Sequence, residues 1–142
     1  MLGTFSAMEV AASGLSAERS RMNTIASNLA NAKTTRTANG GPYKRIDPVF
    51  TAQALDESSF DATERNVQLV KVSEIKEDTR DPMKVYEPGH PDADPTGYVS
   101  YPNVNVVEEM VNMITASRAY EAGVSSIESV KSMAQTALGL GK

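Results

Sequence analysis

Cysteine is absent from this 142-residue chain, and histidine occurs only once, as His90. Without cysteine the chain can form no disulfide and no thiolate metal site. One histidine cannot build a histidine-based metal site or a Ser-His-Asp triad. The net charge is −4 and no basic stripe is visible, which argues against nucleic acid as a partner. We therefore expect neither a metal nor a cofactor.

Long apolar runs are also missing. None approaches the roughly 18 residues that span a bilayer, so we expect no direct membrane insertion. The N-terminus lacks a signal-peptide core and has no Lys or Arg before Arg19. We expect a protein that either stays in the cytoplasm or leaves by a route without a cleaved signal.

Proline is missing from both ends, because all seven prolines lie between Pro42 and Pro102. Since proline disrupts helix interiors, the ends can be helical and the middle cannot. We predict one helix over residues 4–31. A second opens at Pro102-Asn103, with Asn103 or Asn105 as its N-cap, and ends at the glycines at 139 and 141.

These boundaries predict an α+β fold that is mainly α. Residues 1–32 form the first helix, 33–102 a loop and a small β-rich middle region, and 103–142 the second helix. The two helices should pair as an antiparallel coiled-coil hairpin, forming one structural unit with the middle region inserted between them.

Charge is scarce in the first helix, where the first 32 residues carry only Glu9, Glu18, Arg19 and Arg21. A seven-residue apolar period keeps one seam facing the same partner along a helix. Such a stripe usually marks a core within one chain, but the low charge elsewhere favours burial by neighbouring helices as well. The first seam consists of Met1, Met8, Leu15, Met22 and Leu29, widened by Phe5, Ala12, Ile25 and Ala26.

The second helix carries the same seven-residue period. Its seam consists of Val106, Met113, Tyr120, Ile127 and Ala134, with Met110, Ala116, Val124, Val130 and Ala137 or Leu138 in the complementary positions. We predict an assembly interface made of Met8, Leu15, Met22, Ile25, Asn28, Leu29, Asn31, Met110, Met113, Tyr120, Val124, Ile127, Val130 and Leu138.

The middle region contains four short segments that favour strands, at 49–55, 67–73, 83–86 and 98–101. The polar run 77–82 should turn the chain between the second and third segments into an antiparallel hairpin. Residues 57–65 are polar and should form a loop. Because large apolar residues are few, the middle should lean on the helices.

Candidate sites in the middle have weak signals. Residues 92–97 match the first half of a calcium loop, but the twelfth position is Asn103, which cannot supply a bidentate carboxylate. A solvated turn is the simpler interpretation. No pocket-forming sequence accompanies the acidic residues, so a general acid/base pair has no support and we predict no catalytic residue.

Four motifs follow one another closely in the first helix and just after it: Ser13-Gly14-Leu15-Ser16-Ala17, Arg21-Met22-Asn23, Ala26-Ser27-Asn28-Leu29-Ala30-Asn31 and Thr34-Thr35. Together they resemble the N-terminal signature of bacterial flagellar rod and hook proteins. Within that family, the segments 41–45, 85–91, 97–99, 102–112 and 117–122 are similar to the proximal rod proteins. Gly123 departs from the pattern, which usually has Asn there, and a mid-helix glycine costs roughly 1 kcal/mol relative to alanine.

The resemblance implies a structural, non-enzymatic subunit of the basal-body rod. Such a subunit is exported without a cleaved signal by the flagellar type III apparatus and polymerises into the periplasmic drive shaft. The implied partners are other copies of the chain and the rod proteins FlgB, FliE, FlgF and FlgG. A cytoplasmic helical-hairpin adaptor or export chaperone would share the helical seams, whereas a peptidoglycan hydrolase would need a catalytic constellation that is not visible.

Asn28 and Asn31 lie off the apolar seam near the end of the first helix. In one interpretation the two residues cap the helix end, because asparagine is favoured near helix ends. Alternatively, their amides hydrogen-bond to neighbouring subunits, where their loss would leave buried partners unsatisfied at roughly 1–3 kcal/mol each.

Overall fold

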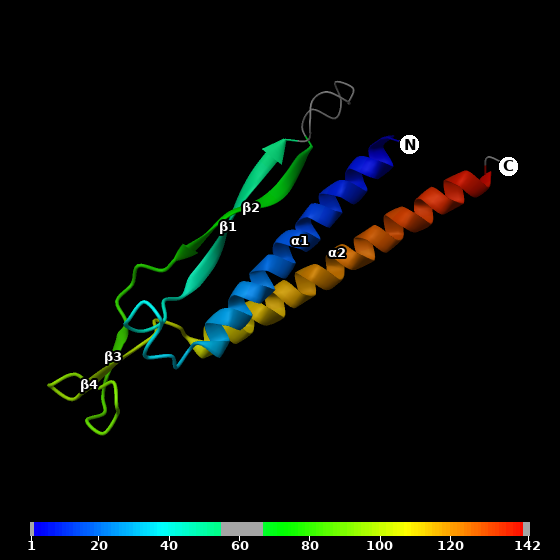
Figure 1. Cartoon of the computed structure of the whole chain (residues 1–142). Helices are drawn as coiled ribbons and strands as arrows, with labels where there is room; N and C mark the ends of the chain where they lie inside the picture. Colours follow the sequence, from blue (N-terminus) through cyan, green and yellow to red (C-terminus); the bar gives the residue numbers. More distant parts are fainter. Residues whose placement is uncertain (1, 55–66, 141–142) are drawn as a thin grey trace.

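The computed structural model describes residues 2–54 and 67–140, so the whole of the loop expected at 57–65 lies outside the described residues. The fold is α+β, with two long helices at the ends of the chain and short antiparallel strands between them (Figure 1). The elements are α1 (Leu2–Ala30), β1 (Ile46–Ala54), β2 (Gln68–Glu77), β3 (Met83–Tyr86), β4 (Tyr98–Tyr101) and α2 (Val106–Leu140).

The predicted helices are present with small shifts at their ends. The first begins two residues earlier than predicted, and the second begins only at Val106 and passes through Gly139 to Leu140. Asn105 is the N-cap, because its Oδ1 accepts hydrogen bonds from the backbone N–H groups of Val107 (3.1 Å) and Glu108 (3.3 Å). No helix in the described ranges is long and apolar enough to cross a membrane.

The two helices lie against each other and run in opposite directions, so both termini are at the same end of the molecule (Figure 1). Two contacts define their register. Asn28 hydrogen-bonds to Glu109, and Leu15 lies against Gly123. The distance from Asn28 back to Leu15 along α1 nearly equals the distance from Glu109 forward to Gly123 along α2. Antiparallel packing requires this match.

Helix α1 is the central element, because α2 covers one side and the β1–β2 hairpin another. The backbone N–H of Val70 in β2 donates to Ser13 Oγ at 3.2 Å, which anchors the hairpin to α1. Only a narrow stripe of α1 remains exposed beyond residue 8, formed by Glu9, Ala12, Ser16, Arg19, Asn23, Ala26 and Ala30. The prediction that Ala12 and Ala26 widen the apolar seam is therefore wrong, since both lie on the exposed stripe.

The strands form two separate two-stranded sheets, β1–β2 and β3–β4, both antiparallel. The predicted hairpin between the second and third strands is wrong. After β2, the N–H of Asp78 donates to the carbonyl of Arg45 at 2.7 Å, which extends the β1–β2 ladder beyond Ile46 and Glu77. Nine cross-strand pairs with β1 outweigh the closure entropy of the longer β1–β2 connection, which grows only slowly with length.

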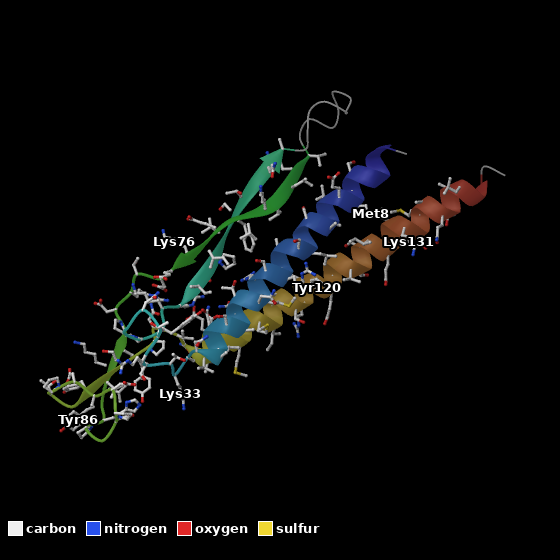
Figure 2. All side chains as sticks on the ribbon, viewed as in Figure 1. Met8, Lys33, Lys76, Tyr86, Tyr120 and Lys131 are labelled. Atoms are coloured by element: carbon white, nitrogen blue, oxygen red, sulfur yellow. The ribbon has the colours of Figure 1, made fainter. Side chains whose placement is uncertain are left out.

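The β3–β4 sheet projects from the end of the molecule opposite the termini, and Tyr86 marks this end in Figure 2, far from Met8 and Lys131. Within the described residues it packs against no helix and no other strand, so only the first hairpin leans on the helices as predicted. Tyr86 and Tyr98 pack edge to face across the sheet, with ring centroids 5.3 Å apart. Gly97 turns the chain beside them with a φ of 84°, a conformation that favours glycine.

Candidate assembly site: a buried polar junction and the helix seams

The side chain of Asn28 is fully buried where α1, the start of β1 and the start of α2 meet. Its Nδ2 donates to the carbonyl of Ile46 (2.9 Å) and to Glu109 Oε2 (3.1 Å). Its Oδ1 accepts from Tyr43 Oη–H (3.0 Å) and from the N–H of Ile46 (3.0 Å). All four hydrogen-bonding positions of the amide are occupied. Asn28 thus acts on Ile46 as a neighbouring strand would.

The predicted partners of Asn28 were wrong in both alternatives. Its amide does not cap the end of α1, and because it is fully buried with all four hydrogen-bonding positions filled, it has none left for a neighbouring subunit. Asn31 does cap the helix. Its Nδ2 donates to the carbonyl of Ser27 at 2.9 Å, and its Oδ1 accepts from Thr34 Oγ1 at 3.2 Å. The helix-cap interpretation is therefore confirmed for Asn31.

Glu109 and Arg45 complete the junction with a largely buried ion pair. Arg45 Nε donates to Glu109 Oε1 at 2.7 Å, and the two side chains are 11% and 1% exposed. Arg45 also pairs with Asp47. Burial alone would lower the pKa of the Arg45 guanidinium, but hydrogen bonds to Asp47 and Glu109 outweigh it, so the pKa is raised above its ordinary value. The guanidinium remains charged and holds the buried carboxylate in place.

Asn103 links the junction to the segment before β3. Its Oδ1 accepts from the N–H of Arg45 at 3.0 Å, and its Nδ2 donates to the carbonyl of Arg80 at 3.2 Å. Asn103 was one of the two predicted helix caps, but its side chain instead joins two loops. Arg80 hydrogen-bonds to Asp78 in a tight turn and thereby lowers the pKa of the Asp78 carboxyl to about 2.

The protected face of α2 follows a strict seven-residue period. Met113, Tyr120, Ile127 and Ala134 lie on it as predicted, and so do Ala116 and Val130. At two of the complementary positions the prediction is wrong by one residue. Glu109 and Gly123 lie on the protected face, where Met110 and Val124 were predicted. A search for apolar periodicity misses a charged residue or a glycine on a helix seam, because neither is counted as apolar. The available signal was their spacing, since Glu109 and Gly123 lie seven residues either side of Ala116.

Gly123 explains how the two helices approach each other. A Cβ at this position would meet Leu15 Cδ2 at 2.7 Å and Leu15 Cγ at 3.2 Å, so the missing side chain leaves space for Leu15. Helix α2 continues without interruption through Gly123. The glycine therefore serves close helix packing, and its intrinsic cost of roughly 1 kcal/mol is offset by this contact.

The predicted assembly residues fall into three groups of exposure. Ile25 and Asn28 are enclosed within the chain, whereas Met110, Val124 and Leu138 are exposed. Those that are half-buried are Met8, Leu15, Met22, Leu29, Asn31, Met113, Tyr120, Ile127 and Val130.

The acidic loop before β4 forms turns. Asp94 Oδ1 accepts from the N–H of Thr96 (2.8 Å), the hydroxyl of Thr96 (2.5 Å) and the N–H of Tyr98 (3.0 Å), which lowers the pKa of Asp94. Asp92 Oδ2 accepts from Thr35 Oγ1 at 2.8 Å and joins this loop to the segment after α1. Both carboxylates therefore have structural partners.

Both ends of the chain match known protein-family models. Residues 8–36 match the model for flagella basal body rod proteins, and residues 96–140 match that for the C-terminal region of flagellar basal body rod FlgEFG proteins. These regions contain most of α1 and all of α2, the helices that the junction joins. The fold and the matches define a flagellar basal-body rod protein.

Relatives over nearly the whole length specify the family further. The chain is 44% identical to the flagellar basal-body rod protein FlgC of Borreliella burgdorferi, covering 98% of both chains. It is 42% identical to FlgC of Escherichia coli (94% and 95% covered) and 40% identical to FlgC of Bacillus subtilis (97% and 98% covered). The chain belongs to the FlgC family. The family is structural and non-enzymatic.

Proposed function

We propose that this structural rod subunit polymerises through α1 and α2 to build the proximal part of the flagellar drive shaft, which transmits torque across the periplasm. The observation that carries the proposal is the uncovered apolar face at the start of α2, where Val107, Met110, Val111 and Ile114 are each more than half exposed. An apolar face does not stabilise a helix when it is left in contact with water. It does stabilise the helix when neighbouring subunits cover it.

The total surface supports the same proposal. The chain exposes 9897 Å², whereas a compact monomer of this mass would expose about 7,100 Å². The excess of about 2,800 Å² equals between three and four contributions of about 800 Å² each, the area that one partner gives to a standard interface. An elongated subunit with several neighbours would use this surface.

Within the subunit, α1 and α2 would pair as a coiled coil along the seven-residue period from Glu109 to Ala134. The predicted assembly residues contribute in two ways under this proposal. Half-buried residues such as Leu15 and Ile127 hold the two helices together, and exposed ones such as Met110 and Leu138 contact neighbouring subunits. The junction at Asn28 ties the β-rich middle to the rigid helix pair, so that a load on one is passed to the other.

The partners would be other copies of the chain and the rod proteins FlgB, FliE, FlgF and FlgG. Delivery would use the flagellar type III export apparatus without a cleaved signal. A fold without cysteine suits this route, because refolding after export then requires no disulfide. Neither nucleic acid nor membrane insertion has a part in this function.

Basal bodies purified from a motile strain provide the test. A tagged copy of the chain should be enriched in them, with little in the cytosolic fraction. Leu15→Asp should abolish rods and motility, because it places a carboxylate against Gly123 on α2, where an unpaired buried charge costs several kcal/mol. Ala38→Asp, exposed in the loop after α1, is the control and should leave motility intact. A mainly cytosolic chain would contradict the proposal.

A further inference from the structure

An open groove of about 380 Å³ runs between the helix pair and the β1–β2 hairpin. Small residues of both helices form its floor, including Gly14, Ala17 and Gly123, and Phe50 and Val70 of the hairpin form a wall. Phe50 and Val70 are both exposed despite their apolar side chains. A floor of small residues allows the backbone of another helix to approach closely.

Glu18 gives the groove a charge. Its Oε2 is buried and accepts no hydrogen bond from the residues that the structure describes, and its ion pair with Arg21 is long, with Nη1 3.9 Å away. A buried carboxylate oxygen without a donor costs more free energy than a paired one. The groove is therefore complementary to an apolar element that also carries a cation.

The outer face of α2 has this composition. Val107, Met110, Val111 and Ile114 form an apolar stripe at helical spacing, and Arg118 follows one turn after Ile114 on the same side. Arg118 is exposed, and within the described parts of the chain it takes part in no ion pair. In its own chain Arg118 faces away from α1, because Ala116 and Tyr120 on either side of it face α1.

From these observations, and resting on the proposed function, we infer that the outer stripe of α2 in one copy docks into the groove of a second copy, where Arg118 pairs with Glu18. The stripe and the groove are different surfaces of the same chain. An interface between them is heterologous, so each copy keeps a free stripe at one side and a free groove at the other and the contact can repeat. The excess surface leaves room for this contact on both sides.

The absence of native cysteine permits a direct test by crosslinking. Two differently tagged versions of the full chain, one with Ile114→Cys and one with Val70→Cys, are produced together in cells that lack the native gene. Their basal bodies are then treated with a short bismaleimide. We expect a crosslinked dimer that carries both tags. Thr136→Cys in place of Ile114→Cys is the matched control, because it lies roughly 33 Å further along α2 and should yield no dimer.

A charge exchange tests the ion pair independently. Arg118→Glu should cause loss of rods, and adding Glu18→Arg should restore them, whereas two residues with unrelated roles would not rescue each other. Circular dichroism of the purified variants checks that they fold.

Three results would overturn the inference while leaving the proposed function in place: crosslinking of Ile114→Cys to itself, crosslinking to a different protein, or no dimer although both versions are in the basal bodies. If tagged chains that carry no cysteine substitution were missing from the basal bodies, both the inference and the proposed function would be overturned.

Discussion

Replacing Asn28 by alanine should destabilise the subunit more than any other single asparagine change in α1. The substitution removes all four hydrogen bonds of the amide, and two of the lost partners are the backbone N–H and carbonyl of Ile46. Glu109 retains Arg45, and Tyr43 Oη has Ser27 Oγ at 3.4 Å, so these two side chains keep a neighbour.

The magnitude follows from the two backbone groups of Ile46. Each unsatisfied buried group costs about 1–3 kcal/mol, so the expected loss is roughly 2–6 kcal/mol before water compensates for part of it. Since a domain of this size is stable by only about 5–15 kcal/mol, the loss is a large share of the total.

Urea unfolding of the purified chain, followed by circular dichroism, measures this loss as a lower midpoint. Asn23→Ala is the matched control, since Asn23 is exposed on the same helix, and its effect should stay within about 0.5 kcal/mol. If Asn28→Ala also stayed within that range, the junction would not hold the middle region to the helices and the reasoning would be refuted.

Further predictions concern the ion pair, the helix contact and an acidic turn. Arg45→Ala should lower the free energy of unfolding by roughly 3–5 kcal/mol. The double change Arg45→Met with Glu109→Leu should lower it less, because this change leaves no unpaired buried charge. Equal losses of stability in urea unfolding would contradict this prediction. Gly123→Val should destabilise the native chain but do so less in a Leu15→Ala background, and simple additivity of the two changes would exclude their contact. The Asp78 carboxyl has its pKa lowered from 3.8 to about 2, so its stabilising effect is present above pH 4 and is lost as the pH falls from about 4 to 2. Asp78→Asn should remove that part of the acid dependence, and an NMR titration of Asp78 near 3.8 would contradict the prediction.

Features that depend on residues close together in the chain could be predicted from the sequence alone. The absence of proline outside 42–102 placed both helices, and Asn105 and Asn31 were recognisable as candidate caps, because capping depends on residues within one turn. The seven-residue period identified Met113, Tyr120, Ile127 and Ala134 as one face of α2. The motifs from Ser13 to Thr35 were dense enough to indicate the rod family.

Contacts between residues far apart in the chain could be identified only from the fold. Asn28 and Glu109 are 81 positions apart, and no periodicity predicts that an amide on one helix will satisfy a strand and a second helix together. Gly123 appeared to be a defect until Leu15 was placed against it. The β1–β2 pairing likewise joins residues distant in sequence, from Ile46 with Glu77 to Ala54 with Gln68. Local sequence sets which elements can form, whereas the energy of burial and pairing between remote segments selects their arrangement.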